Sequence, residues 1–125
     1  MDYQVLENEE LIVRVLNKGA EISSIQSKKD GTEYIWQADR NYWSRHAPIL
    51  FPIVGKLKGD QYQLDGETYH MSQHGFARDR DFLVTNHSSD TLAMTLSEDE
   101  ESLNIYPFKF CLLYTSDAAD DMQCV

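Results

Sequence analysis

Short apolar runs alternate with turn residues along the first part of the chain, and this spacing most constrains its fold. Residues Leu11–Leu16 alternate between two faces, which places Val13 and Val15 on the same side of an extended strand. The flanking segments Asn17–Ala20 and Lys28–Thr32 carry the Asn, Asp and Gly residues that turns require. No stretch in this region holds a 3.6-residue apolar period for three turns. The pattern therefore predicts an antiparallel all-β domain.

Further strands are predicted where the same pattern recurs: Tyr3–Leu6, Ile22–Ile25, Glu33–Gln37, Phe82–Thr85, Thr91–Leu96 and Tyr106–Phe110. Asp65-Gly66 separates two short apolar segments and predicts a tight β-hairpin, because this dipeptide readily adopts the backbone angles of a two-residue turn. The acidic run Glu98–Glu101 is predicted to be a solvated loop.

The segment Arg45–Gly55 is strongly apolar but contains Pro48 and Pro52. The two prolines exclude a regular central strand or a helix interior, so the segment is expected to be buried in an irregular or edge conformation. The backbone groups of such a segment need hydrogen-bond partners, and segments of this kind often line pockets. Arg45 and His46 at its start are either pocket residues or the polar rim of a core segment.

The stretch that most suggests a functional site is Ser72–Arg78, Ser-Gln-His-Gly-Phe-Ala-Arg. Gly75 allows the backbone to turn or to approach a ligand closely. His74 and Gln73 provide an imidazole and an amide, and Arg78 provides a fixed fork of donors. Such a cluster suits a polyhydroxylated or anionic small molecule. The alternative is a simple turn that carries a surface histidine and a surface arginine.

Composition excludes several classes of partner. The chain has 125 residues, enough for one domain, and 21 acidic residues against 11 basic ones give it a net charge of −10. This balance argues against nucleic acid and anionic membranes as partners, since both require a basic surface. Acidic residues follow Met1 closely, so no secretory signal is expected. No apolar run approaches the length that spans a membrane. A cytoplasmic location is therefore the default expectation.

No metal or cofactor is predicted. Both cysteines, Cys111 and Cys124, lie in the last fifteen residues, which indicates neither a disulfide framework nor a thiolate metal site. His70 and His74 are four residues apart, but on strands this spacing does not direct both rings at one point. His70 and His87 are interpreted as surface residues.

Three segments, Arg45–Gly55, Gln73–Arg78 and Tyr106–Phe110, resemble the aldose 1-epimerase family in sequence, order and spacing. The resemblance is strongest to its galactose mutarotase-like, LacX-type branch and covers residues 1–110. It implies the family fold, a large antiparallel β-sandwich known as the galactose mutarotase-like supersandwich. This chain would form only the N-terminal portion of that fold, because family members are more than twice as long.

The resemblance also implies a reaction, the interconversion of α and β anomers of a free or phosphorylated hexose through acid–base ring opening. His74 matches the first of the two histidines that the family uses. Gln73 and Arg78 match positions that contact sugar or phosphate, and Arg45 is a further expected contact. The second histidine, which is the acid, and the glutamate base have no counterpart in this chain. The 125-residue chain is therefore expected to be inactive.

Two other functions remain open at the level of the sequence. The same fold can serve as a non-catalytic carbohydrate-binding domain, because fold does not determine function. The chain can also be a structural β-domain with an incidental histidine. A second histidine and a glutamate that face the site in the full-length protein would distinguish the enzyme from both.

The sequence at the end of the chain suggests that residues 111–125 have a different origin from residues 1–110. Residues Cys111–Asp121 resemble the translation of a sequencing-library adapter over eleven consecutive positions. Our hypothesis is that residues 111–125 are an artefact of a truncated read and that residues 1–110 are the natural N-terminal portion. Re-sequencing the locus decides between this hypothesis and a natural tail. A different open frame past Phe110 supports truncation, whereas the same residues followed by a stop codon refute it.

Overall fold

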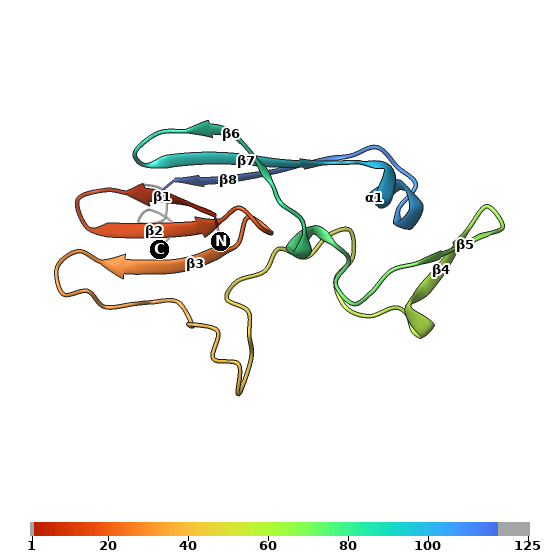
Figure 1. The fold of residues 1–125 in the computed structure, drawn as a ribbon, viewed down its shortest axis with the longest axis horizontal. Coiled ribbons are helices and arrows are strands. Elements are labelled where there is room, and N and C mark those ends of the chain that lie inside the picture. Colours follow the sequence, from red (N-terminus) through yellow and green to blue (C-terminus); the bar gives the residue numbers. More distant parts are fainter. Residues whose placement is uncertain (1, 118–125) are drawn as a thin grey trace.

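The computed structural model of the chain describes residues 2–117. Two three-stranded antiparallel sheets lie one against the other, and a two-stranded hairpin extends from one end (Figure 1). The first sheet contains β1 (Tyr3–Glu7), β2 (Leu11–Leu16) and β3 (Ile22–Ser27); the second contains β6 (Leu83–His87), β7 (Thr91–Ser97) and β8 (Cys111–Asp117); the hairpin is β4 (Gln61–Leu64) and β5 (Glu67–His70). Three short helical segments complete the fold: η1 (Lys58–Asp60), η2 (Ala77–Asp79) and α1 (Glu100–Ile105). The predicted antiparallel all-β class is confirmed.

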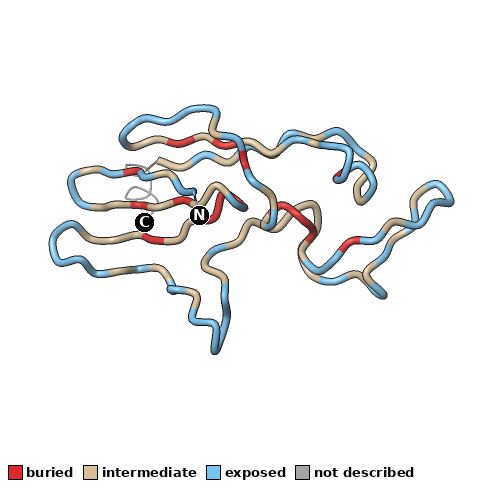
Figure 2. The backbone as a smooth tube through the Cα atoms, viewed as in Figure 1, coloured by how far each residue is buried: buried red, intermediate tan, exposed pale blue. Residues whose placement is uncertain are grey.

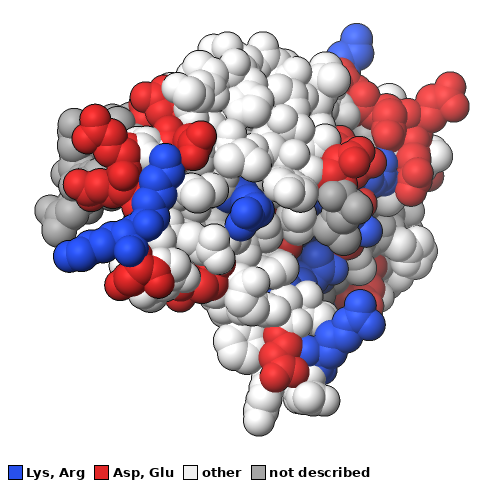
Figure 3. Space-filling view, turned by 60° about the vertical axis from the view of Figure 1, so that its left-hand side comes forward, with Lys and Arg blue, Asp and Glu red and all other residues white. Residues whose placement is uncertain are grey.

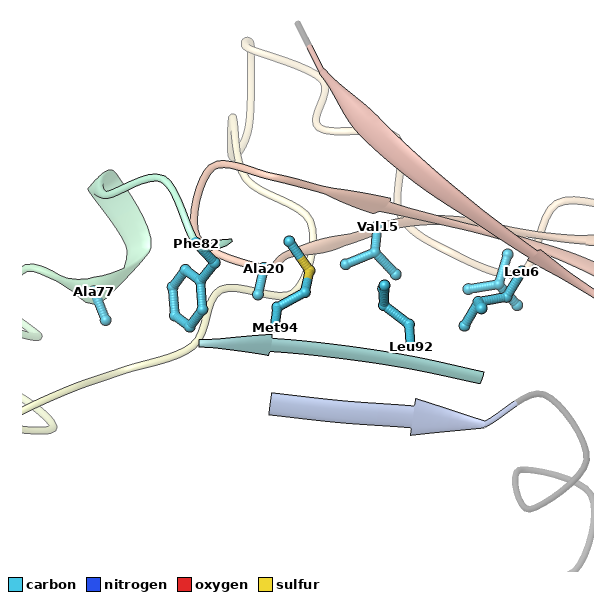
Figure 4. Packing of buried hydrophobic residues seen from close by; sticks show 8 residues of the cluster. Leu6, Val15, Ala20, Ala77, Phe82, Leu92 and Met94 are labelled. Carbon is cyan, nitrogen blue, oxygen red and sulfur yellow. The ribbon is translucent and has the colours of Figure 1, made fainter. Parts of the chain in front are cut away.

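The hydrophobic core lies between the two sheets. Val13 and Val15 of β2 are both buried, as the alternation of that strand predicts. They belong to one cluster with Leu92 and Met94 of β7 and Leu6 of β1, which also includes Ala20, Ala77 and Phe82 (Figure 4). Figure 2 shows the buried positions concentrated on the strands and on the segment that joins the second sheet to the hairpin. The first part of that segment, directly after the hairpin, carries the candidate site.

The turn between β2 and β3 attaches the first sheet to this segment. Gly19 has a φ of 76° and donates its backbone N–H to the carbonyl oxygen of Arg80 at 2.7 Å. A Cβ atom at position 19 would lie 2.7 Å from the carbonyl oxygen of Arg78, so only glycine fits here without a shift of the backbone. The turn therefore holds the start of β3 against residues 78–80.

The β4–β5 hairpin is confirmed as predicted. Asp65 and Gly66 have φ angles of 50° and 80°, the left-handed conformation that a type I′ turn needs at both positions. Tyr62 and Tyr69 pair directly across the hairpin, and their rings stack with centroids 5.3 Å apart. β5 ends at His70 and delivers the chain into the Ser72–Arg78 segment.

The prediction of a strand at Glu33–Gln37 is wrong, because only one isolated bridge forms there, between Gln26 and Glu33. The Glu33 carboxylate accepts hydrogen bonds from the Ser24 hydroxyl and from the backbone N–H groups of Ile25 and Ile35. The carboxylate thus occupies backbone N–H donors that would pair with a neighbouring strand in a regular β-sheet. Burial opposes ionisation, but these hydrogen bonds together hold the pKa of Glu33 below its ordinary value of 4.5.

The prediction of a strand at Tyr106–Phe110 is also wrong. The aromatic side chains of this segment pack around Phe51, with ring centroids 6.0 Å away for Tyr106 and 5.1 Å away for Phe110. Side-chain packing against the irregular Arg45–Gly55 segment therefore determines its path, and β8 begins only at Cys111.

The acidic run expected to be a loop instead leads into α1. The Asp99 side chain accepts a hydrogen bond from the Ser102 N–H at 2.7 Å, and the Ser102 hydroxyl accepts one from the Asp99 N–H at 2.9 Å. This reciprocal pair is a capping box, which satisfies two free donors at the start of a helix. The Ser102 backbone hydrogen bond lowers the pKa of Asp99, and Arg80 at 3.1 Å contributes to the same effect.

The segment after Phe110 forms strand β8, paired with β7 from Cys111↔Ser97 to Asp117↔Thr91. Backbone ladders form between many different sequences, so this pairing does not reveal the origin of residues 111–117. Residues 118–125, the rest of the proposed artefactual tail, lie outside the described residues. The boundary after Phe110 stays a prediction.

Candidate functional site

The Ser72–Arg78 segment lies alongside the irregular Arg45–Gly55 segment. Phe51 and Gly75 form a parallel bridge, and the carbonyl oxygen of Phe51 accepts hydrogen bonds from the N–H groups of Phe76 at 2.9 Å and Ala77 at 3.2 Å. The N–H of His74 donates to the carbonyl oxygen of Gly55 at 2.8 Å. The irregular segment thus satisfies its backbone groups by fixing the loop that carries the candidate site.

Gly75 makes this close approach possible. Its φ is 71°, and a Cβ atom at this position would lie 2.3 Å from the carbonyl oxygen of Phe51 and 2.7 Å from the ring of Pro52. The glycine in the motif is therefore required by the backbone contact itself.

The His74 ring is held in a defined tautomer. Its Nδ1 accepts a hydrogen bond from the Gly55 N–H at 2.8 Å, so in the neutral ring the proton lies on Nε2. The side-chain amide of Gln73 lies 3.4 Å from Nε2. Because Nε2 is the donor, the amide oxygen is the group that can pair with it, after a half-turn of the amide. His74, which is half-buried, therefore offers one N–H donor at its outer nitrogen.

Arg78 connects this histidine to a neighbouring pocket. Its Nη2 donates to the carbonyl oxygen of Gln73 at 3.2 Å, which ties together Gln73, His74 and Arg78. Arg78 and Arg45 both line a pocket of 290 Å³, which we call the Arg45 pocket. Arg45 forms an ion pair with Asp79 at 2.9 Å. Gln73 and His74 are not among the residues that line this pocket. Of the four predicted site residues, three form one cluster, and Arg45 joins Arg78 in the pocket beside it.

Sequence reasoning missed two residues that shape the site. Gly55 orients the His74 ring through its backbone N–H, although in the sequence it is only the end of an apolar segment. Glu21 lines the pocket, is only 9% exposed, and places its Oε2 at 3.5 Å from Nδ1 of His46. No motif surrounds Glu21. Glu21 reaches the pocket because the turn that precedes it places Gly19 against the backbone of Arg78, a long-range contact that the sequence does not reveal.

A larger hollow of 480 Å³ lies elsewhere, lined by Ile22, Asn86 and residues of β7 and β8. It shares no residue with Ser72–Arg78 or with the Arg45 pocket. We regard the smaller pocket as the better candidate, because ionisable side chains converge on it.

Residues 2–117 were also compared with the requirements of a metal site and of a membrane-spanning helix. No group of three or more His, Cys, Asp or Glu side chains in this range could hold a metal ion. None of the helices in the same range has the length and apolar character needed to cross a membrane. Acidic and basic side chains alternate around an uncharged area on the face shown in Figure 3.

The sequence matches the aldose 1-epimerase family over residues 2–120. The chain belongs to this family. The relatives within it include the chromosomal protein LacX of Lactococcus lactis subsp. lactis, 35% identical over 117 residues, which are 88% of this chain and 39% of that protein. The resemblance seen in the sequence is thus confirmed.

Solved structures of the family show the same fold. A galactose mutarotase related enzyme from Lactobacillus acidophilus superimposes with a TM-score of 0.91 at 44% identity, covering 93% of this chain and 39% of that one. A galactose mutarotase-like protein from Lactobacillus casei gives a TM-score of 0.88 at 43% identity, covering 91% and 39%. The chain therefore has the galactose mutarotase-like all-β fold and spans about 39% of the length of these epimerase-family relatives.

Proposed function

We propose that the full-length protein interconverts the α and β anomers of a hexose in the cytoplasm. The observation that carries this proposal is the hydrogen bond from the Gly55 N–H to Nδ1 of His74, which leaves a fixed N–H donor at Nε2. Membership of the aldose 1-epimerase family supports the reaction class.

Anomer exchange requires two proton movements. A base removes the proton of the anomeric hydroxyl while an acid protonates the ring oxygen, after which the ring opens and closes on the other face. Nε2–H of His74 is suited to donate a hydrogen bond to the ring oxygen, since charge develops there as the C–O bond breaks. Gln73, Arg78 and Arg45 would hold the hydroxyl groups of the sugar. Each positioned acid or base contributes about 10²- to 10⁴-fold to such a reaction.

The described residues supply only part of this machinery. Within residues 2–117, the ring of His74 has the Gly55 N–H and the Gln73 amide as hydrogen-bond partners, and no carboxylate forms an ion pair with it. The acid histidine and base glutamate that the family uses would come from sequence that this chain does not span. We therefore propose that the 125-residue chain alone does not catalyse the reaction.

The test is polarimetry on the full-length protein, with freshly dissolved α-D-glucose and α-D-galactose. We expect rapid relaxation of optical rotation, a loss of about 10²-fold or more in His74→Ala, and normal rates in His70→Ala, a control at an exposed histidine on β5. Matching thermal melts would show that both variants fold. If the wild-type protein binds galactose in calorimetry without accelerating mutarotation, the non-catalytic sugar-binding alternative replaces this proposal.

A further inference from the structure

The Arg45 pocket is lined by side chains of both charge signs. Six ionisable side chains line it: Lys18, Glu21, Arg45, His46, Arg78 and Asp79. Asp79 neutralises Arg45 through an ion pair of 2.9 Å. Lys18 is exposed to solvent, so its charge is well screened. The charges that dominate the interior of the pocket are therefore those of Arg78 and Glu21.

Glu21 is unusual in this position because it is 91% buried on a lining that also holds arginines. Its nearest ionisable partner is not an arginine but His46, whose Nδ1 lies 3.5 Å from Oε2, beyond a good hydrogen-bond distance. Its other oxygen, Oε1, has no hydrogen-bond partner among the described residues, and Nε of Arg78 likewise has none. Nδ1 of His46 is a third buried atom without a hydrogen-bond partner, so residues of the pocket lining carry polar atoms of Glu21, His46 and Arg78 that no group among the described residues satisfies.

This arrangement distinguishes between two classes of ligand. A sugar hydroxyl both donates and accepts hydrogen bonds, so hydroxyl groups suit a pocket with a carboxylate on one side and a guanidinium on the other. A phosphate group accepts hydrogen bonds and carries close to two negative charges at neutral pH. It could pair with Arg78, but it would be repelled by Glu21, whose burial reduces the screening of its charge by water and salt.

We infer that Glu21 is a specificity-determining residue that makes this pocket accept the hydroxyl groups of a neutral sugar and reject a phosphorylated one. The inference rests on the proposed function, since it concerns the sugar that reaches His74 through the neighbouring Arg78. The position of Glu21 depends on the turn that precedes it, where Gly19 contacts the backbone of Arg78.

The test is calorimetric binding of D-galactose, D-glucose and their 6-phosphates to the full-length protein at low salt. In the wild-type protein we expect each free sugar to bind at least about tenfold more tightly than its phosphate. Glu21→Gln keeps the shape of the side chain and removes its charge. It should therefore lower the ratio of the affinity for the free sugar to the affinity for its phosphate about tenfold, chiefly by strengthening binding of the phosphate. The effect of Glu21→Gln on this affinity ratio should be smaller at high ionic strength.

Two further variants control the experiment. Glu21→Asp retains the charge and should retain discrimination against the phosphate. Glu67→Gln removes a carboxylate from the exposed β5 strand and should leave the ratio unchanged. If Glu21→Gln fails to fold, a wild-type preference for the sugar phosphate, or a loss of discrimination in Glu21→Asp, still overturns the inference.

The inference is overturned if the wild-type protein prefers a sugar phosphate, if none of these sugars binds, or if a folded Glu21→Gln protein discriminates as the wild type does. Binding is measured apart from turnover, so the two proposals can fail separately. A charge-dependent ratio without anomer exchange would refute the catalytic function and leave the role of Glu21 in place.

Discussion

Replacing Gly75 with alanine tests whether the contact between the two irregular segments holds the site together. Two costs add at this position. A φ of 71° places alanine in the left-handed region, at about 1–2 kcal/mol. The new Cβ would lie 2.3 Å from the carbonyl oxygen of Phe51, and overpacking of this kind costs about 1–3 kcal/mol. The obstacle is backbone, so it cannot rotate away as a flexible side chain would.

The same oxygen accepts the hydrogen bonds of Phe76 and Ala77, so any relaxation would weaken both. We therefore place the cost near the top of the combined range, at about 3–5 kcal/mol. Gly66→Ala is the matched control, because Gly66 has a φ of 80° and no atom within 4 Å of an added Cβ. It should show only the backbone cost, about 1–2 kcal/mol.

The assay is urea unfolding of the full-length protein and both variants, compared through their midpoints at a common slope. If Gly75→Ala loses no more stability than Gly66→Ala, then the contact with Phe51 is not a constraint, and our account of the motif glycine is wrong.

Two further predictions concern stability. Glu33→Gln should destabilise the protein by about 1 kcal/mol at neutral pH. Because the pKa of Glu33 is lowered in the folded state, this difference should be complete above pH 4.5 and disappear as the pH falls through the folded pKa, which melts recorded across this pH range would check. The 125-residue chain expressed alone should be poorly soluble or partly unfolded, because a shortened sandwich exposes strand edges and an inner sheet face; a sharp cooperative melt together with monomeric sedimentation would contradict this.

The strands that the sequence predicts correctly are those with a local cause. β2 follows from strict alternation, and β4 and β5 follow from the backbone angles that Asp65 and Gly66 adopt. The strands predicted at Glu33–Gln37 and Tyr106–Phe110 fail for non-local reasons. In the first, a carboxylate takes backbone donors; in the second, rings pack on Phe51, far away in sequence. α1 did have a local signal, the Asp99–Ser102 spacing, which the acidic run obscured.

The candidate site divides in the same way. The sequence identifies Gln73, His74 and Arg78 because they are neighbours in one motif. It does not identify Glu21, which reaches the pocket through the packing of a distant turn, or Gly55, which contributes a backbone N–H and no side chain. Side-chain motifs are visible in a sequence, whereas backbone donors and long-range neighbours are not.

The contact between Gly19 and the backbone of Arg78 has a consequence during synthesis of the protein on the ribosome. The first three strands emerge early, but the N–H of Gly19, in the turn that follows β2, has no partner until the chain has been extended through Arg80. Domains tend to fold as units while translation proceeds. The nascent N-terminal sheet must therefore remain only partly anchored until the segment that carries His74 has left the exit tunnel, and a pause in translation before that point would prolong its exposure to chaperones.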